Sequence, residues 1–408
     1  MLFFYLSVFI FSRVLKPIII IPSHFGSRLH INTTRQPFWY CAKSLTDRHV
    51  WIRVRDLVPP FVHCVLDYLT VDLDPVTGNL TSRPNTTLYT VDFGGIEGIK
   101  GIGPEYFGHY LPVNYIEYIK AFLDIGYVVR KNLFSAPYDW RFGLEQPEDY
   151  YIKLTELIEH AYEINNNKKV ALLSHGLGST LIHMFLTERK SAEWRKKYID
   201  SSTYIGPAWS GSGQALFSTW RLRFPFFHFT FKSLKRFVAS LGCFHAQIPN
   251  AIAYENTTIL ITPDGVNHTG RDVLDILRKH GKLTPEQLKI AEKNFKYSQS
   301  LPKYPDFNVN ILYNSGVPTP IGLKLKSWDD VGMPIYGRGD SLMGSKVIDW
   351  ACDNWQQTGI ELRCHDAFSD KIKYHHRYLL KSAEMAVLVR SWICKEYHDK
   401  RNLYKVEL

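Results

Sequence analysis

The segment from Lys169 to Ser179 reads KVALLSHGLGS, and it decides the fold. Its residues 170–173 form a short apolar run, which is typical of a strand that is buried on both faces. A turn that contains two glycines follows, and residues 180–189 have the apolar spacing of a helix. The segment therefore predicts a buried strand that turns sharply into a helix.

The same alternation of strand and helix recurs along the chain. We expect further strands at 17–22, 127–129, 202–205 and 309–313, and helices at 113–125, 151–164 and 376–393. Strands that alternate with helices predict an α/β fold with a mostly parallel, doubly wound sheet. Two segments, 31–71 and 210–300, interrupt this pattern, and we expect both to be insertions over the active edge of the sheet.

Composition narrows the classes of partner. With 408 residues, 45% of them apolar and 22% charged, the chain is long enough to bury a large core. Its net charge of +10 favours anionic membrane surfaces. The basic residues are dispersed and no nucleic-acid-binding motif is present, so we expect no nucleic acid partner. Neither His375-His376 nor His365-Asp366 supplies the three or four ligands of a metal site, and we expect no metal and no cofactor.

Several features point to the secretory pathway. Residues 1–15 contain a short apolar run, which we interpret as a signal peptide, with an alternative gene start or a short buried strand as the other readings. The final residues KVEL resemble a retention signal of the endoplasmic reticulum lumen, and they are equally compatible with an arbitrary charged tail. Asn-x-Thr sequons predict glycosylation on a lumenal surface at Asn32, Asn79, Asn85, Asn256 and Asn267.

Four motifs carry a resemblance to a known family. The frame Ser174-His-Gly-Leu-Gly178 stands where an α/β-hydrolase has the G-x-S-x-G turn that presents its nucleophilic serine. The stretches SAPYDWR (135–141), NSGVPTP (314–320) and GRGD (337–340) resemble, in this order, motifs of the lecithin:cholesterol acyltransferase family and the related lysosomal phospholipase/transacylase. The resemblance extends over residues 17–394. It implies an α/β-hydrolase core made of 16–30, 72–209 and 301–408, a disulfide-closed membrane-binding insertion at 31–71, and a cap or lid at 210–300.

The resemblance also implies a set of catalytic positions. The family uses a serine, an aspartate and a histidine to transfer an acyl group from a phospholipid, through an acyl-enzyme, to water or an alcohol. The aspartate falls on Asp340 and the histidine on His376, with the adjacent His375 as a rival. The backbone amides of His24 and Leu177 would form the oxyanion hole. The serine falls on Gly176, which has no side chain.

The glycine at position 176 predicts impaired catalysis. Removing the nucleophile of a serine hydrolase costs on the order of a million-fold in turnover. Ser174 and Ser179 lie near this position in the sequence, but neither occupies the tip of the turn. A glycine also relieves a strained backbone conformation that costs other residues about 1–3 kcal/mol. A genuine Gly176 and a sequence error at this codon remain open.

Candidate lipid contacts occur in both insertions. The segment 221–237 interleaves aromatic and basic residues, among them Phe227 and Phe229, and it fits either a lipid surface or a buried strand. By the resemblance, Cys41 and Cys64 form a disulfide, and Trp51 and Phe61 are apolar anchors. Cys352 falls on a disulfide position of the family, and its pairing stays open, with Cys364 as a candidate and Cys243 and Cys394 also unassigned.

These observations define three functional hypotheses. The first is a lipid-metabolism protein of the phospholipase A and O-acyltransferase type that is a pseudoenzyme at Gly176 and still binds a phospholipid membrane, a lipoprotein surface or an acyl-lipid ligand. The second is an active phospholipase or O-acyltransferase. The third is a non-catalytic lumenal interaction protein. All three place the chain in the secretory pathway, either secreted, lysosomal or in the lumen of the endoplasmic reticulum.

Overall fold

A computed structural model of the chain describes residues 15–101, 115–224, 231–369 and 375–395. Its centre is a six-stranded sheet in the order β15-β12-β9-β8-β1-β7, and every neighbouring pair of strands is parallel. The strands are β1 (Ile18–Ile21), β7 (Leu133–Ser135), β8 (Val170–His175), β9 (Ile199–Ile205), β12 (Asn308–Tyr313) and β15 (Leu362–Asp366). The expected α/β fold with a parallel sheet is confirmed.

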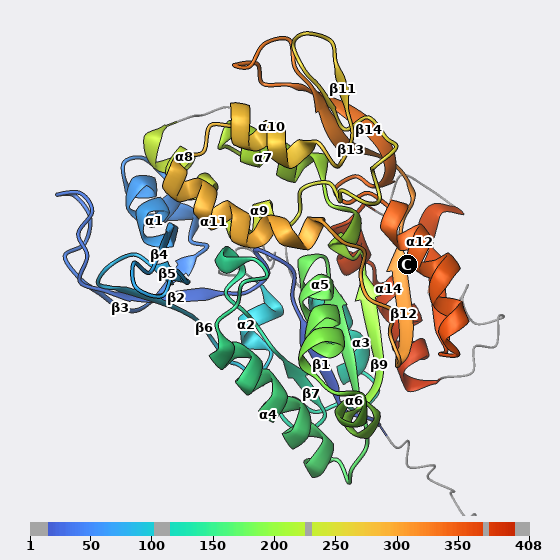
Figure 1. Ribbon diagram of the computed structural model, residues 1–408. Coiled ribbons are helices and arrows are strands. Elements are labelled where there is room, and N and C mark those ends of the chain that lie inside the picture. The colour runs from blue at the N-terminus through green and yellow to red at the C-terminus, as the bar shows by residue number, and fades with distance from the viewer. Residues whose placement is uncertain (1–14, 102–114, 225–230, 370–374, 396–408) are drawn as a thin grey trace, which may run out of the picture.

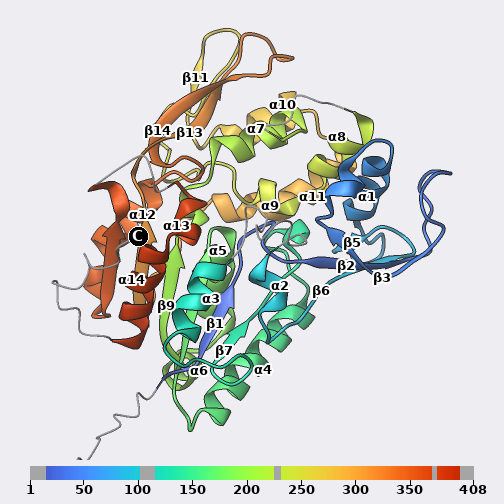
Figure 2. The same ribbon diagram turned by 180° about the vertical axis from the view of Figure 1, so that it is seen from behind.

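Helices cover both faces of this sheet (Figures 1 and 2). Strand β1 has apolar side chains on both faces of the sheet, and both faces must therefore be covered. Ile19 and Ile21 pack into one buried cluster, and Ile18 and Ile20 pack into another. The first cluster includes α4 (Glu148–Ile164), α5 (Leu177–Met184) and α12 (Lys346–Asn354), and the second includes α3 (Ile116–Leu123) and α14 (Ala383–Cys394). Helix α6 (Ala192–Tyr198) leads into β9. A four-isoleucine strand is thus buried from both sides.

Two details of the sequence prediction were wrong. The strand expected at 127–129 does not form, because the chain turns tightly there, with the amide of Leu133 donating to the carbonyl of Val128, and 133–135 pairs with β1 instead. The single helix expected at 376–393 is divided into α13 (Tyr378–Lys381) and α14, because the Ser382 hydroxyl accepts a hydrogen bond from the Met385 amide and starts a new helix.

The first insertion lies beside the core, on the left in Figure 1. The predicted insertion 31–71 holds most of β2 (Leu29–Thr33), β3 (Leu45–Trp51) and α1 (Phe61–Leu69), and β4 (Val71–Leu73) begins at its end. The segment predicted as core continues with β5 (Leu80–Ser82), which forms a hairpin with β4, then β6 (Thr86–Thr90), which pairs with β2, and α2 (Glu97–Lys100). The expected Cys41–Cys64 disulfide is present. Arg141, from the 135–141 motif, is fully buried, pairs with Asp139 and donates to the Ser82 hydroxyl at 3.0 Å, which ties the hairpin to the core.

The second insertion forms a layer of helices above the sheet, at the top of Figure 1. It comprises α7 (Gly213–Arg221), α8 (Lys232–Ala239), α9 (Gly242–His245), β10 (Leu260–Ile261), β11 (Asn267–His268), α10 (Val273–His280) and α11 (Pro285–Phe295). Strands β13 (Gly316–Lys324) and β14 (Met333–Asp340) join β10 and β11 in one four-stranded sheet. The boundary drawn at residue 301 assigned β13 and β14 to the core, yet these strands pair with the cap.

Two polar contacts connect the first insertion to the second. The Nδ1 atom of His63 lies 2.7 Å from the Ser233 hydroxyl, and the amide of Val71 donates to the Ser240 hydroxyl at 3.0 Å. A disulfide joins Cys352 to Cys364, which settles the pairing that the sequence left open.

In the described part of the chain, no helix combines the length and the apolar character needed to cross a membrane.

Candidate active site

The sharp turn between β8 and α5 places Gly176 at its tip. This glycine has φ 53° and ψ −123°, a conformation that residues with side chains rarely adopt. A Cβ atom on Gly178 would lie under 3.0 Å from the carbonyl oxygen of Pro22, so a glycine is needed there for α5 to start against the end of β1. The strand, turn and helix that the sequence indicates therefore form, and Gly176 presents no side chain at the tip.

Asp340 and His376 meet above this turn. The Nδ1 atom of His376 lies 2.6 Å from Oδ2 of Asp340, and the amide of His376 donates to the Asp340 carbonyl at 2.8 Å. Both side chains are buried, at 3% exposure each. The amide of Met343 donates to Oδ1 of the same carboxylate at 2.7 Å and fixes its orientation. Asp340 ends β14, so the cap sheet positions one member of the pair.

The structure distinguishes His376 from its rival. Only the ring of His376 contacts Asp340, whereas the buried Nδ1 atom of His375 has no hydrogen-bond partner among the described residues. The Nε2 atom of His376 is also buried and lacks a partner within that same part of the chain. A Cβ atom on residue 176 would lie 3.3 Å from it. The free nitrogen of the pair therefore faces the tip of the turn.

Gly206 makes room for this pair, and the sequence analysis missed it. It follows β9 directly and has φ 48°. A Cβ atom there would lie 2.9 Å from Nδ1 of His376 and 3.1 Å from Oδ2 of Asp340. The available signal was a glycine at the carboxyl end of an expected parallel strand, where the functional groups of such sheets gather.

Ser23 is the second residue that the sequence analysis passed over. It follows β1, is only 3% exposed, and its Oγ lies under 3.0 Å from the position of a Cβ on residue 176, closer than real Cβ atoms approach a neighbour. The amide of Leu177, which was predicted to serve the oxyanion hole, lies 3.4 Å from this oxygen and donates to it. His24, the other predicted oxyanion residue, has its Nδ1 3.3 Å from the same oxygen. A serine hydroxyl is thus present at the turn, although it comes from another strand.

Three uncharged polar side chains, His24, His175 and Tyr115, lie next to Ser23 and His376. Burial, followed by the charges of His376 and Arg377, lowers the pKa of His24 to about 3. Burial also lowers the pKa of His175 well below its usual value, and the His175 ring lies 4.4 Å from the His376 ring. Burial raises the pKa of Tyr115, whose hydroxyl accepts a hydrogen bond from the Ser23 amide at 2.7 Å. At neutral pH these three side chains are uncharged and contribute hydrogen bonds alone.

The two serines near Gly176 in the sequence point elsewhere. Ser174 donates to the Ser179 hydroxyl at 3.2 Å and contacts the carbonyl of Thr203 at 3.3 Å. Ser174 and Ser179 are both buried, at 1% and 0% exposure. Their hydroxyls therefore join β8 to α5 and to β9, away from the tip.

The predicted lipid contacts are only partly at the surface. Trp51, which was predicted as an anchor, is only partly exposed: its indole packs between Phe25 and Trp140, at 5.1 and 4.8 Å, and donates to the Phe25 carbonyl. Phe61 is 51% exposed, and Trp39, which the prediction omitted, is 89% exposed. The predicted contacts Phe227 and Phe229, and the signal peptide except for residue 15, lie outside the described residues. All five sequon asparagines are exposed.

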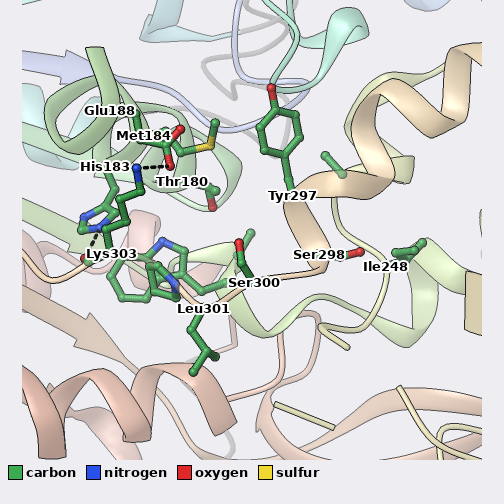
Figure 3. Close-up of a pocket in the computed structure, with 14 residues that line it drawn as sticks. Thr180, His183, Met184, Glu188, Ile248, Tyr297, Ser298, Ser300, Leu301 and Lys303 are labelled. Carbon is green, nitrogen blue, oxygen red and sulfur yellow. Dashed lines mark hydrogen bonds and ion pairs between the residues drawn. The ribbon is translucent and has the colours of Figure 1, made fainter. Parts of the chain in front are cut away.

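A cavity of about 200 Å³ lies between α5 and the cap (Figure 3). Its walls include Thr180 and His183 of α5, and Tyr297 and Leu301 from the segment after α11. His183 is held by the Tyr204 hydroxyl and the Lys303 carbonyl, and burial lowers its pKa to about 4. Neither the Asp340–His376 pair nor Ser23 lines this cavity, so it is separate from the site described above.

Sequence comparisons identify the known proteins that this chain resembles. The family described as lecithin:cholesterol acyltransferase matches residues 46–279. Phosphatidylcholine-sterol acyltransferase of Homo sapiens is 25% identical over 371 residues, which cover 85% of this chain and 78% of that protein. The same enzyme of Mus musculus is 27% identical over 208 residues, or 50% of this chain and 46% of that protein. Lysosomal phospholipase A and acyltransferase of Bos taurus is 22% identical and covers 83% of each chain.

Among solved structures, the chain is similar to a chain of the Tle4-Tli4 complex. The TM-score is 0.49 at 14% identity, with 93% of this chain and 98% of that chain covered. The family match extends from the first insertion through the turn at Gly176 and into the cap, and therefore over more than half of the sequence. The chain belongs to the lecithin:cholesterol acyltransferase family.

Proposed function

We propose that this protein binds phospholipid acyl esters at the Asp340–His376 pair and that its acyl transfer to water or an alcohol is strongly impaired. The observation that carries the proposal is the buried Nε2 of His376, which has no hydrogen-bond partner among the described residues and faces a glycine at the tip of the turn. The base has its carboxylate, and the Leu177 amide is in place to bind an oxyanion. What is missing at position 176 is the hydroxyl that would form the acyl-enzyme.

The exposed apolar residues of the first insertion support docking on a membrane or lipoprotein surface. Trp39 stands 89% exposed beside the Cys41–Cys64 disulfide, and Val58 and Phe61, at the start of α1, are 57% and 51% exposed. Tryptophan is favoured at the interface between lipid and water, where its ring is buried and its N–H stays hydrated. The net charge of +10 adds attraction to anionic lipid.

A location in the secretory pathway is part of the proposal. Two disulfides are present, and disulfides persist mainly in oxidising compartments. The five sequons stand on exposed asparagines, as glycosylation would require. The similar bovine protein is named a lysosomal enzyme, which is compatible with an acidic endpoint for this chain.

Vesicle flotation tests lipid binding. Full-length protein is mixed with phosphatidylcholine vesicles, with and without phosphatidylserine, at pH 7.4 and pH 5, and it should float with the lipid. Trp39→Ser should weaken binding about ten-fold, since one partly inserted indole contributes about 1.4 kcal/mol. Val76→Ser is the matched control, because Val76 is 91% exposed but belongs to the turn between β4 and β5. No flotation at either pH would refute lipid binding.

Release of fatty acid from phosphatidylcholine tests the impairment. Wild-type protein, His376→Ala and an active member of the family are assayed in parallel. We expect the wild-type rate to fall orders of magnitude below that of the active relative, because the nucleophile position is vacated. A wild-type rate equal to that of the relative would show that catalysis is intact and would contradict this part of the proposal.

A further inference from the structure

We propose that Ser23 is a relocated nucleophile, which supplies the hydroxyl that position 176 lacks and allows slow acyl transfer through an acyl-Ser23 intermediate. This inference rests on the proposed function, namely that a phospholipid ester binds at the Asp340–His376 pair. It explains why a base, its carboxylate and an oxyanion amide remain assembled around a turn that has no hydroxyl of its own.

Position is the first argument. A Cβ atom on residue 176 marks the point from which the usual nucleophile would extend. The Ser23 Oγ lies under 3.0 Å from that point, and Nε2 of His376 lies 3.3 Å from it. The hydroxyl and the free nitrogen thus border the same small volume. Hydrogen bonds between nucleophile and base are often long in proteins without substrate and shorten when the ester binds.

The second argument is that Ser23 is held rigidly. Its amide donates to the Tyr115 hydroxyl at 2.7 Å, and its carbonyl accepts from the Gly26 amide at 3.0 Å. It directly follows Pro22 at the end of β1, a strand between two others in the core sheet. Reactive groups placed by such an element keep their geometry better than groups on a mobile loop.

The third argument concerns the oxyanion hole. The Leu177 amide donates to the Ser23 Oγ at 3.4 Å, which is a long hydrogen bond. When the hydroxyl attacks an ester, this amide can transfer its hydrogen bond to the carbonyl oxygen, where negative charge develops. The His24 Nδ1 atom lies 3.3 Å from the Ser23 Oγ, but burial lowers the pKa of His24 to about 3, which makes its imidazole a weak base for the Ser23 proton.

The reaction balances with these groups alone. His376 Nε2 takes the proton of the Ser23 hydroxyl while Oγ bonds to the acyl carbonyl carbon, and Asp340 stabilises the charged imidazole through Nδ1. The bond from that carbon to the glycerol oxygen then breaks, and the departing oxygen takes the proton from Nε2 to give a lysophospholipid. Water or an alcohol next gives its proton to Nε2 and attacks the acyl-serine. The proton returns to Ser23, and a fatty acid or a new ester leaves.

Other serines near the turn do not fit this role. Ser174 and Ser179 hydrogen-bond to each other below the tip, and Ser174 also bonds to the Thr203 carbonyl. Their hydroxyls are occupied in joining strands and helix, whereas the Ser23 Oγ lies beside the tip of the turn at Gly176. Ser174→Ala is therefore a matched control for Ser23→Ala, since both substitutions remove one buried hydroxyl.

Covalent labelling decides the question. Full-length protein is incubated with a fluorophosphonate probe, which reacts with activated serines, and the adduct is mapped by mass spectrometry. We expect the adduct on Ser23 in wild-type protein, its loss in Ser23→Ala and His376→Ala, and its retention in Ser174→Ala. No adduct on native protein, an adduct on another residue, or unchanged labelling of Ser23→Ala would each overturn the inference.

Two further readouts separate the possible failures. Mapping on the wild-type protein does not depend on whether a variant folds, and melting curves of Ser23→Ala and Ser174→Ala identify any loss of structure. Vesicle flotation is measured on the same samples. Protein that floats but carries no adduct refutes the Ser23 nucleophile alone, whereas protein that neither floats nor labels refutes lipid binding as well.

Discussion

Returning a serine to position 176 should be costly unless Ser23 is changed as well. The Gly176→Ser side chain enters a backbone conformation with φ 53°, for which about 1–3 kcal/mol of strain is expected. Its Cβ would also lie 3.1 Å from the Ser23 Cβ and closer still to the Ser23 Oγ. Overpacking of this kind costs about 1–3 kcal/mol. The single variant should therefore lose about 2–6 kcal/mol in its free energy of unfolding.

Ser23→Gly removes the two Ser23 atoms that the new Cβ meets and leaves Nε2 of His376, at 3.3 Å, as its neighbour. In that background Gly176→Ser should cost only its backbone strain, about 1–3 kcal/mol. The two substitutions should therefore show a favourable coupling of about 1–3 kcal/mol, measured by denaturant unfolding of the wild type, both single variants and the double variant. Gly359→Ala is a control for strain alone, because Gly359 has φ 75° and a Cβ there would meet nothing within 4 Å.

The same four proteins also show which serine reacts with the fluorophosphonate probe. A hydroxyl at position 176 would extend from a Cβ that lies 3.3 Å from Nε2 of His376, so the double variant should be labelled by the fluorophosphonate probe at position 176. The adduct should thus move from residue 23 to residue 176. The reasoning would be refuted by a coupling within about 0.5 kcal/mol of zero, which is the scatter of independent sites.

Two further predictions follow from the buried histidines and from Gly206. Burial lowers the pKa of His183 and of His245 to about 4, whereas each titrates near 6.5 when unfolded, so the unfolded chain binds more protons between these values. Stability should fall as the pH falls from 6.5 to 4, by about 3 kcal/mol for each histidine, and His183→Gln should reduce the slope of unfolding free energy against pH. An equal slope in both proteins would contradict this. Gly206→Ala should displace His376 from Asp340 and abolish probe labelling, because the new Cβ would lie 2.9 Å from Nδ1, whereas Gly359→Ala should leave labelling unchanged.

Local sequence was sufficient to predict the core and the sharp turn at Gly176. A run of four isoleucines and the stretch 170–173 indicate strands buried on both faces, since a parallel sheet covered by helices excludes water from each side. The glycines at 176 and 178 mark a turn that packs tightly against a neighbouring strand. These signals depend on residues close in the chain, and they can be read without knowing what lies nearby in space.

Prediction failed where distant segments meet. Periodicity indicated a strand at 127–129, but pairing with β1 selected 133–135. The resemblance suggested Trp51 as an anchor, because in a sequence an aromatic residue of an insertion looks the same whether it faces lipid or packs, as Trp51 does, against Phe25 and Trp140. The exposed residue, Trp39, was recognisable only once the Cys41–Cys64 loop had a shape.

The sequence by itself determined that position 176 has no nucleophile, since a glycine has no side chain in any fold. The resemblance to the family added Asp340 and the neighbours His375 and His376 as candidates for the site. Only the tertiary structure chose His376 over His375 and brought the Ser23 hydroxyl to the turn, 154 residues from the Leu177 amide that donates to it. The physical reason is that this contact depends on the register of β1 beside β8, which sets Ile21 opposite Ser174 and so carries Ser23 to the tip of the turn.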